Sequence, residues 1–567
     1  MGVWVLLPLA GGGLAMADEA GAAGAAAVAA GGAADPWLAW QALRSLGEAS
    51  TRLGVVLQLP ASPPPPGALD RWIGEPLRAV ILPVAAFTPN RRGCPVLGKA
   101  HQAALEALFA AGVQVILGGP TPPPGRFGAA AGEGPQMLPP SQEAPTPWPA
   151  PYWEYLAFAF RRPPSPDADA ALEASYRDYL QAPLQPLQDN LESQTYETFE
   201  RDGAKYEAYG EAVRRLLEDR ARVEKKGGAA ATVIMVVGAG RGPLVAASLA
   251  AADALGAPVR VYAVEKNPNA VITLQGRLAS DPAWGLPVEA PRGGAGTATQ
   301  PRVTLIAGDM RGWTPPERAD VLVSELLGSF GDNELSPECL DGAQRLLKRA
   351  GEGGPGEGGA GISIPSSYTS FLQPVSAARL WADVKGYEDL EHSETPYVVK
   401  MHRFSPLAET APVFTFSHPR GGEAEVGNGD AAMVDGDGDA AATPSTPPAD
   451  LALDPRANTR YASLTFARAG APAGLVHGLA GYFETHLYGG VTLSTHPPTH
   501  TPGMASWFPI FFPLAVPFLA PAGMPLTVHM WRCVSPVKVW YEWAVAAASG
   551  AATHIHNVNG RSYFVGL

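Results

Sequence analysis

Two glutamates, Glu325 and Glu334, lie nine residues apart on either side of a glycine-containing turn. A single glutamate at a strand end is usually a solvated or capping residue, but two that converge on one cleft can grip a planar cation. A guanidinium presents five N–H donors in a fixed fork and stays protonated, so paired carboxylates are its natural receptor. They also offset its repulsion by a second cation, about 4 kcal/mol for unit charges ~4 Å apart at an effective dielectric of about 20. The spacing therefore predicts a site in which one guanidinium nitrogen is left to attack an electrophile.

A glycine-rich run follows a predicted strand earlier in the chain. The apolar segment 233–237 leads directly into Gly238, Gly240 and Gly242. Glycines at the carboxyl end of a strand let the backbone approach a ligand, and the helix beyond them presents unpaired N–H groups. The spacing is G-x-G-x-G, whereas the dinucleotide fingerprint is G-x-G-x-x-G. Alone, the run fits the packing of a turn as well as it fits ligand binding.

The next two predicted strands also end in side chains suited to a ligand. Glu265 ends the second strand, 25 residues after Gly240, where a carboxylate can accept hydrogen bonds from both hydroxyls of a ribose. Asp309 and Met310 end the third strand, and we expect them to accept from an adenine amine and to contact its ring. Three successive strand ends of this kind favour an adenosine-bearing ligand. Because no Walker lysine pattern is present to hold phosphates, S-adenosyl-L-methionine fits better than a nucleotide.

These motifs require a doubly wound α/β domain, which we place at residues 186–360. Short apolar strands separated by amphipathic helices are typical of parallel sheets with helices on both faces. The predicted helices are 202–222 and 242–255, and the predicted strands are 232–237, 259–264, 303–306 and 319–323. A glycine-rich run, 351–361, predicts the end of this domain.

The first 185 residues predict part of a βα (TIM-like) barrel. We expect strands at 55–59, 79–83 and 113–117, helices at 36–54 and 99–111, and the remains of a first strand at 3–10. Low-complexity stretches, 21–34 and 118–151, interrupt them and carry no predicted structure. A complete barrel takes about 250 residues, so only part of one is predicted here.

Residues 361–567 predict a C-terminal β barrel for substrate binding and dimerisation. Short alternating segments such as 526–533 and 539–545 are typical of antiparallel strands. An acidic insertion, 419–455, interrupts them. Its Asp435–Asp439 run resembles a calcium loop, but it lacks the turn glycine and the bidentate glutamate, so we interpret it as a solvated loop.

Composition narrows the class of protein. Lys and Arg total 41 against 54 Asp and Glu, a net charge of −13, which argues against direct nucleic-acid binding and favours a basic partner. The three cysteines are far apart and form no CxxC or Cys/His cluster, so the sequence predicts neither disulfides nor a metal site. This cysteine usage also predicts a reducing compartment. Nothing in the sequence approaches the roughly 20 apolar residues of a membrane span, and the apolar start lacks the preceding basic residues of a signal peptide.

The chain closely resembles the family of protein arginine methyltransferase five, the symmetric-dimethylating (type II) arginine methyltransferases. The resemblance is looser over 36–119 and closer over 152–567, outside the low-complexity insertions. Its most specific runs are Ser193–Glu200, Val237–Leu244, Tyr262–Asn269, Ser324–Phe330 and Gly503–Ile510.

The resemblance implies roles for individual residues. It implies that the double-E loop, Glu325 to Glu334, binds the substrate guanidinium. Phe199 would form the roof of the site, and Trp507, preceded by Ser506 where asymmetric enzymes carry His, the opposite wall. The family's contacts to S-adenosyl-L-methionine fall on Tyr196, Lys205, Tyr206, Gly238, Gly240, Gly242, Glu265, Asp309 and Met310. From the sequence alone, core packing would be the preferred interpretation of Phe199 and Trp507.

The implied function is mono- and symmetric dimethylation of arginine in Arg/Gly-rich proteins such as histones and splicing factors, in cytoplasm and nucleus. In animal relatives the N-terminal barrel docks a WD-repeat partner and helps to assemble the oligomer. Because 195 residues precede Tyr196 here and the family's barrel is longer, the shortened barrel argues against assuming the WD-repeat partner or this route of assembly. A homo-oligomer is still expected. Two alternatives stay open: an asymmetric (type I) enzyme, for which Met at 199 or His at 506 would have argued, and a non-catalytic scaffold.

Overall fold

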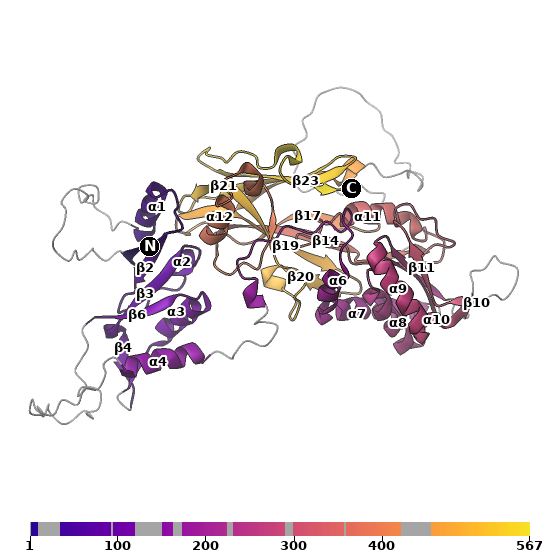
Figure 1. The fold of residues 1–567 in the computed structure, drawn as a ribbon, viewed down its shortest axis with the longest axis horizontal. Helices are drawn as coiled ribbons and strands as arrows, with labels where there is room; N and C mark the ends of the chain where they lie inside the picture. Colours follow the sequence, from indigo (N-terminus) through magenta and orange to yellow (C-terminus); the bar gives the residue numbers. More distant parts are fainter. Residues whose placement is uncertain are drawn as a thin grey trace, which may run out of the picture.

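A computed structural model shows three parts arranged in a row (Figure 1). Antiparallel sheets from the C-terminal third lie in the middle, with an N-terminal parallel sheet on one side and a second parallel sheet on the other. Within the described residues, no helix is both long and apolar enough to cross a membrane. The predicted insertions 21–34, 118–151 and 419–455, with the calcium-like run, lie almost entirely outside the described residues. The structure describes residues 2–9, 35–91, 94–119, 150–162, 173–223, 231–289, 299–355, 359–420 and 455–567.

The N-terminal part is an open four-stranded parallel sheet in the order β1-β2-β3-β6. Three tryptophans, Trp37, Trp40 and Trp72, are fully buried between its helices and strands. The predicted βα units are present, but the first helix ends at Leu46 rather than at 54, because Glu48 and Ala49 adopt positive φ angles that end a helix. The elements are β1 (Val3–Pro8), α1 (Pro36–Leu46), β2 (Leu53–Gln58), α2 (Asp70–Ile73), β3 (Leu77–Pro83), β4 (Phe87–Pro89), β5 (Pro95–Leu97), α3 (Lys99–Ala110), β6 (Gln114–Gly118) and α4 (Ala150–Arg161).

The N-terminal sheet lies against the antiparallel part of the molecule (Figure 1). The carbonyl of Gly74 accepts a hydrogen bond from the Ala378 N–H at 2.9 Å, and a Cβ at Gly74 would lie 2.5 Å from the carbonyl oxygen of Ser376. The buried Arg44 pairs with Glu75 at 3.1 Å and reaches His477 of the central sheet at 3.4 Å. This close backbone approach fixes the N-terminal part to the central sheets.

The second parallel sheet has the order β11-β8-β7-β12-β13, so the strand order reverses between β7 and β12. Every residue of β7 is buried, as expected of a strand with helices on both faces. Asn267 caps α9 by accepting from the Asn269 N–H, and Pro268 begins that helix. The elements are α6 (Ser193–Glu200), α7 (Gly203–Val223), β7 (Thr232–Val237), α8 (Pro243–Leu255), β8 (Val259–Glu265), α9 (Pro268–Ser280), α10 (Pro282–Gly285), β9 (Pro287–Glu289), β10 (Thr299–Pro301), β11 (Val303–Ala307), β12 (Val321–Ser324), α11 (Ser336–Ala343) and β13 (Ile362–Ile364).

Two elements of this part differ from expectation. The short helix α6 was not expected, and it precedes α7 as a separate element. Strand β13 pairs in parallel with β12, so the sheet continues past the glycine-rich run that predicted its end at 360. Glycine-rich composition marks a break in regular structure, but it does not show whether the next strand joins the same sheet.

The C-terminal part, residues 367–567, consists of a seven-stranded and a four-stranded antiparallel sheet. We call these two sheets and their connections the barrel. Both sheets contribute to one apolar core, which includes Phe416, Phe512, Met530 and Trp543. Together with the parallel parts, this arrangement confirms the predicted fold class. The elements are β14 (Ser367–Ser376), α12 (Ala378–Lys385), α13 (Leu390–Ser393), β15 (Tyr397–Val398), β16 (Ser405–Pro406), β17 (Ala411–Ser417), β18 (Arg460–Phe466), β19 (Gly474–His486), β20 (Thr492–Ser494), β21 (Ile510–Ala520), β22 (Leu526–Val534), β23 (Lys538–Ala547) and β24 (Val565–Gly566).

Candidate active site

The glycine run lies at the point where the strand order reverses, between β7 and α8. Gly238, Gly240 and Gly242 have φ angles of 70°, 54° and 92°, in the left-handed region that favours glycine. A Cβ at Gly240 would lie 3.2 Å from the ring of Tyr196, and one at Gly242 would lie 2.8 Å from Trp284. The backbone therefore turns where side chains would be both strained and crowded.

Glu265 ends β8 and holds the glycine run in place. Its Oε2 accepts from the Gly240 N–H at 2.7 Å, and its Oε1 accepts from the Asn267 N–H at 2.6 Å. Burial raises the pKa of Glu265, while these two backbone donors lower it and leave it above its usual value. Each carboxylate oxygen keeps a lone pair for a further donor.

Helix α6 covers the glycine run without being buried itself. The Tyr196 hydroxyl accepts from Asn267 Nδ2 at 3.1 Å, and burial together with the charge of Glu265 raises the pKa of Tyr196 to about 12. Arg241, inside the glycine run, lies 3.3 Å from Glu200 and donates to the carbonyl of Ser193 at 3.0 Å. Polar contacts to the run therefore tie down both ends of α6.

The residues that end β11 form another side of the same region. The Asp309 carboxylate accepts from Arg311 Nε at 3.1 Å and from Nη2 at 2.8 Å. Burial alone would raise the pKa of Asp309, but these hydrogen bonds outweigh it and leave the pKa below its usual value. Met310 is buried, with its Cε 3.8 Å from a Cβ built at Gly238. The structure thus brings Met310 to the glycine run and gives Asp309 a partner that the sequence did not suggest.

Glu325 follows β12 and pairs with Lys205 of α7. Lys205 Nζ donates to Oε2 of Glu325 at 3.0 Å, and the lysine side chain is only 1% exposed. The ammonium nitrogen lies 5.5 Å from the ring centre of Phe199 and 4.9 Å from the ring centres of both Tyr206 and Trp507. The structure therefore gathers four predicted site residues around the ammonium of a fifth, Lys205, and three of the four are aromatic rings that face the cation.

Glu334 lies beside this pair, in surroundings that favour its protonated form. Burial, with the charge of Glu325, raises the pKa of Glu334 to about 8, although Lys205 lowers it in part. Within the described part of the chain, no group donates a hydrogen bond to its carboxyl group. The double-E loop thus presents one carboxylate neutralised by Lys205 and one carboxyl group that can pair with a cation once it ionises.

The segment that carries Ser506 and Trp507 is fixed by contacts with the double-E loop and with β19. Trp507 Nε1 donates to the carbonyl of Leu327 in the double-E loop at 2.9 Å, and its ring meets Phe483 edge-on at 5.0 Å. The Ser506 hydroxyl oxygen is buried and has no hydrogen-bond partner among the described residues. Trp507 therefore lies against the double-E loop, and Ser506 precedes it with a buried hydroxyl group.

Sequence reasoning missed two residues of this region. Asp202, between α6 and α7, accepts from the N–H groups of Ala505 at 2.9 Å and Ser506 at 2.7 Å, and from that of Lys205 at 3.2 Å. The acceptance from Lys205, three residues on, is a local capping pattern, and that signal could have drawn attention to Asp202. Tyr563 has a buried hydroxyl without a partner among the described residues, and burial, with a smaller effect of Glu334, raises the pKa of Tyr563.

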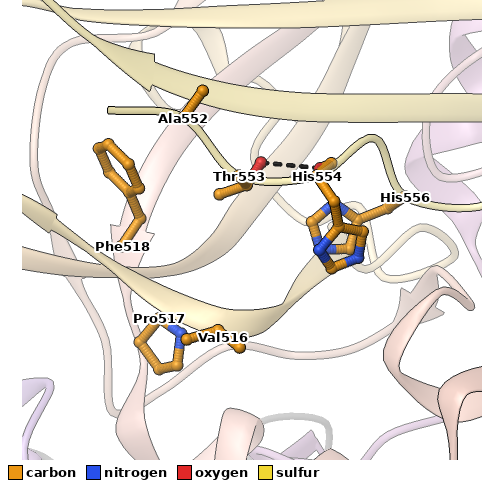
Figure 2. Close-up of a pocket in the computed structure, with 7 residues that line it drawn as sticks. All are labelled: Val516, Pro517, Phe518, Ala552, Thr553, His554 and His556. Atoms are coloured by element: carbon orange, nitrogen blue, oxygen red, sulfur yellow. Dashed lines mark hydrogen bonds between the residues drawn. The ribbon is translucent and has the colours of Figure 1, made fainter. Parts of the chain in front are cut away.

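A separate hollow lies on the central sheets, and none of the residues that line it is a predicted site residue (Figure 2). Its lining includes Val516 and Phe518 of β21 and the segment 552–556. His556 Nε2 accepts from the Ala515 N–H at 3.0 Å, and burial lowers the pKa of His556 to about 4, so this histidine is neutral. The hydrogen bond drawn in this hollow runs from the Thr553 hydroxyl to the carbonyl of His554 at 2.9 Å. These contacts are internal to the barrel.

A glycine run where the strand order reverses, an acidic residue at the next strand end and paired glutamates after β12 define the class of Rossmann-like arginine methyltransferases. Three family models match the chain: the "PRMT5 TIM barrel domain" over residues 1–186, "PRMT5 arginine-N-methyltransferase" over 167–352 and the "PRMT5 oligomerisation domain" over 367–565. The chain belongs to the PRMT5 family of protein arginine N-methyltransferases.

Curated relatives are similar in sequence over most of the chain. It is 46% identical over 536 residues to protein arginine N-methyltransferase 5 of Oryza sativa subsp. indica, covering 94% of this chain and 73% of the relative. It is 41% identical to the Xenopus laevis protein of the same name, covering 94% and 71%. It is 36% identical to protein arginine N-methyltransferase skb1 of Schizosaccharomyces pombe, covering 93% and 75%. Among solved structures, a Trypanosoma brucei PRMT1 enzyme–prozyme complex with AdoHcy aligns with a TM-score of 0.43 and 14% identity, over 66% of this chain and 97% of that one.

Proposed function

We propose that this chain transfers methyl groups from S-adenosyl-L-methionine to arginine in Arg/Gly-rich proteins and forms monomethyl and symmetric dimethyl arginine. The observation that carries the proposal is a cation receptor around Lys205. It consists of the Glu325–Lys205 pair, the rings of Phe199 and Trp507, and Glu334, which can pair with a cation once it ionises. A guanidinium matches this receptor better than an ammonium does, because its planar fork can bond two carboxylates at once.

The glycine run and its surroundings fit S-adenosyl-L-methionine. Close approach of a ligand to the backbone is possible where Gly238 and Gly240 carry no Cβ, and the buried Glu265 has unused lone pairs for ribose hydroxyls. Tyr196, Lys205, Tyr206, Asp309 and Met310 complete the proposed cofactor set. When bound, the cofactor supplies an electrophilic methyl group on a sulfonium.

The two glutamates of the double-E loop are the proposed catalytic residues. Glu325 and Glu334 bind two nitrogens of the guanidinium and draw its positive charge toward them, which leaves the remaining nitrogen more nucleophilic. The aromatic faces of Phe199 and Trp507 exclude water from the guanidinium and strengthen these interactions. This division of roles needs both carboxyl groups in their charged form while substrate is bound.

Symmetric product is proposed from the residues at the roof and wall of the site. The second methyl must reach the unmodified terminal nitrogen, so the first methyl has to fit away from the donor. Phe199 leaves a rigid ring at the roof, and Ser506 leaves a small side chain where a histidine would fill space. This shape favours a type II enzyme.

The substrates proposed are basic Arg/Gly-rich segments, including those of histone tails and splicing factors, in cytoplasm and nucleus. A net charge of −13 favours encounter with basic segments. The test is incubation of the 567-residue chain with S-adenosyl-L-methionine and an Arg/Gly-rich peptide, followed by mass spectrometry that separates the two dimethylarginines. Symmetric product supports the proposal; mainly asymmetric product points to a type I enzyme, and no product despite cofactor binding points to a scaffold.

A further inference from the structure

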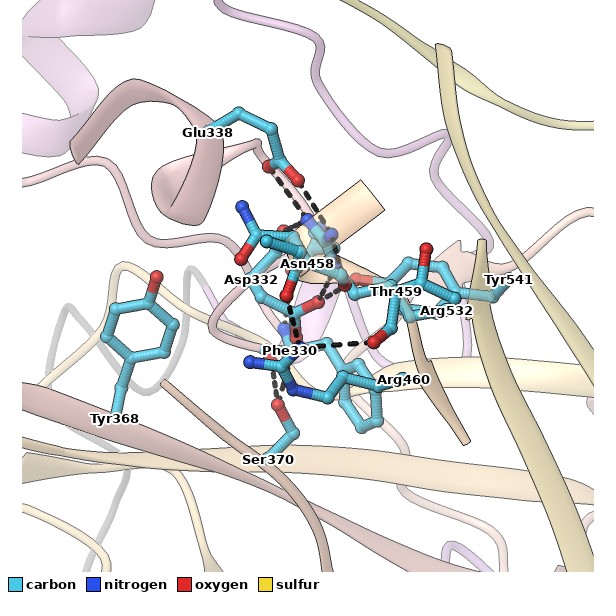
Figure 3. A network of polar contacts seen from close by, with 12 residues as sticks. Phe330, Asp332, Glu338, Tyr368, Ser370, Asn458, Thr459, Arg460, Arg532 and Tyr541 are labelled. Atoms are coloured by element: carbon cyan, nitrogen blue, oxygen red, sulfur yellow. Dashed lines mark hydrogen bonds and ion pairs between the residues drawn. The ribbon is translucent and has the colours of Figure 1, made fainter. Parts of the chain in front are cut away.

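A buried polar network joins the double-E loop to the barrel sheets (Figure 3). At its centre lies Arg532 of β22, a guanidinium with 0% exposed surface. Its Nε donates to Oδ2 of Asp332 at 2.6 Å, and its two terminal nitrogens bond the two oxygens of Glu338 at 2.7 and 2.8 Å. The remaining two N–H groups reach the carbonyls of Asn458 at 3.2 Å and of Asp332 at 3.5 Å. All five donors of the guanidinium are therefore used.

The residues that Arg532 bonds lie on either side of Glu334. Asp332 precedes Glu334 by two residues and Glu338 follows it by four. One guanidinium therefore bridges the two ends of the segment that carries Glu334. Within that segment Leu335 is buried and has a φ of 68°, a left-handed conformation that costs a non-glycine residue free energy. Such a conformation persists only where surrounding contacts fix the backbone, and the bonds of Arg532 supply such contacts.

Asp332 receives further bonds from the barrel. Tyr541 of β23 donates to its Oδ2 at 2.6 Å, and Ser370 of β14 donates to its Oδ1 at 3.0 Å. Ser370 is also 2.7 Å from the carbonyl of Phe330, earlier in the loop. Three strands from two barrel sheets therefore hold the carboxylate of Asp332, within the double-E loop.

Glu325 is held from the opposite side. It directly follows β12 of the parallel sheet and pairs with Lys205 of α7. The two glutamates are thus fixed by different parts of the fold, Glu325 by the parallel sheet and its helix, and Glu334 by the barrel.

We propose that Arg532 is a positioning residue for the substrate: through Asp332 and Glu338 it lets the barrel set the place of Glu334 relative to Glu325. The inference rests on the proposed function of the double-E loop as the guanidinium receptor. It implies that a movement of the barrel sheets changes how arginine is gripped, while cofactor binding at the glycine run stays as it was.

The test uses a mild variant, a severe variant and a matched control in the 567-residue chain. Tyr541→Phe removes one hydrogen bond to Asp332, and Arg532→Lys replaces the fork with a single ammonium. Arg468→Lys is the control, because Arg468 is also buried in the barrel but, among the residues that the structure describes, its side chain donates only to the carbonyls of Leu407, Pro472 and Pro521. Thermal unfolding, S-adenosylhomocysteine affinity by calorimetry, peptide KM and kcat, and hydrogen exchange of residues 327–335 are measured for each.

We expect Tyr541→Phe to raise exchange in 327–335 and to raise the peptide KM about tenfold, with cofactor affinity unchanged. Arg532→Lys should do so more strongly and also lower Tm, whereas Arg468→Lys should lower Tm alone. Unchanged exchange in 327–335, or faster exchange with unchanged KM and kcat, would overturn the proposal. A wild-type chain that methylates no arginine would count against the proposed function instead, and the exchange measurements would still decide whether Arg532 holds the loop.

Discussion

The ammonium nitrogen of Lys205 lies 3.0 Å from Oε2 of Glu325 and faces three aromatic rings. One carboxylate of the double-E loop is thus already neutralised by a side chain that is 1% exposed. A guanidinium that enters beside Lys205 adds a second positive charge to a buried site. Glu334, whose pKa is raised to about 8, must then lose its proton to balance that charge.

The first prediction follows from this proton. Between about pH 7 and about pH 9 the Glu334 carboxyl group changes from mostly protonated to mostly ionised, so the peptide KM should fall as pH rises through about 8. Initial rates at saturating cofactor across this range measure the effect. A peptide KM that stays constant from about pH 7 to about pH 9 would contradict the assignment of Glu334 as a guanidinium ligand.

Rising pH should strengthen peptide binding but weaken the folded state. Because the folded-state pKa of Glu334 lies above its unfolded value, the folded chain binds more protons between about pH 4.5 and about pH 8. The free energy of unfolding should therefore fall with rising pH across this window, and Glu334→Gln should remove that contribution. Denaturant unfolding of wild type and variant at several pH values checks this sign.

The second prediction separates the two glutamates. Removing one partner of a desolvated charged pair costs about 2 to 5 kcal/mol, roughly 30- to several-thousand-fold in rate. Glu334→Gln and Glu325→Gln should both reduce turnover by this amount. Only Glu325→Gln should also lower Tm, because it leaves the buried Lys205 without its carboxylate.

Cofactor affinity, measured by calorimetry with S-adenosylhomocysteine, is the control for this pair of variants. Glu334→Gln should leave it unchanged, since in the described part of the chain no hydrogen bond or ion pair joins Glu334 to the glycine run. Near-normal methylation of an Arg/Gly-rich peptide by either variant would remove the double-E loop from the mechanism.

The third prediction concerns the cofactor pocket. Glu265→Ala should weaken cofactor binding by about 30-fold or more, because it removes the proposed ribose acceptor and also releases the Gly240 N–H. Gly240→Val should block binding through both its positive φ and the Tyr196 ring 3.2 Å from the added Cβ. Unchanged affinity in Glu265→Ala would refute the placement of the cofactor, and Glu265→Gln, with one acceptor oxygen left, should rank between wild type and Ala.

The elements that position the site were largely predictable because their hydrophobic patterns are local. The buried run 232–237 and the glycines after it indicate a strand and a turn without reference to any other segment. The pairing of β13 with β12 was not predictable, because a three-residue strand carries too little pattern to show which sheet it joins. Helix α6 was missed for a related reason: it has eight residues with two large apolar side chains, Tyr196 and Phe199, which is too little pattern to indicate a helix.

The polar partners of the site were harder to predict than its residue types. Asp202 and Ser506 are 304 residues apart in sequence, and no spacing rule connects them. The same holds for Arg532 and Asp332, which meet only because the barrel closes on the double-E loop. Sequence motifs indicate which side chains carry the chemistry, whereas the bonds that hold them depend on tertiary contacts.

The last prediction concerns the symmetry of the product. For the second methyl to reach the unmodified terminal nitrogen, a monomethylated guanidinium must bind with its first methyl away from the donor. Phe199 is the proposed roof of the site, and its ring centre lies 5.5 Å from the Lys205 ammonium. A flexible thioether adapts its shape more readily than a phenyl ring does, so Phe199→Met should relax this choice and allow asymmetric dimethylarginine to appear.

Mass spectrometry of wild type and Phe199→Met on one peptide, with the two dimethylarginines separated by their neutral losses, measures this change. Phe199→Leu is the matched control, because it replaces the ring by a smaller branched side chain and adds no flexible thioether. It should lower the rate while the product stays symmetric. If the methionine variant makes only symmetric product at a normal rate, the ring of Phe199 does not select the nitrogen. Selection would then lie with Ser506 and Trp507, since Trp507 Nε1 is bonded to Leu327 and that wall keeps its shape when the roof changes.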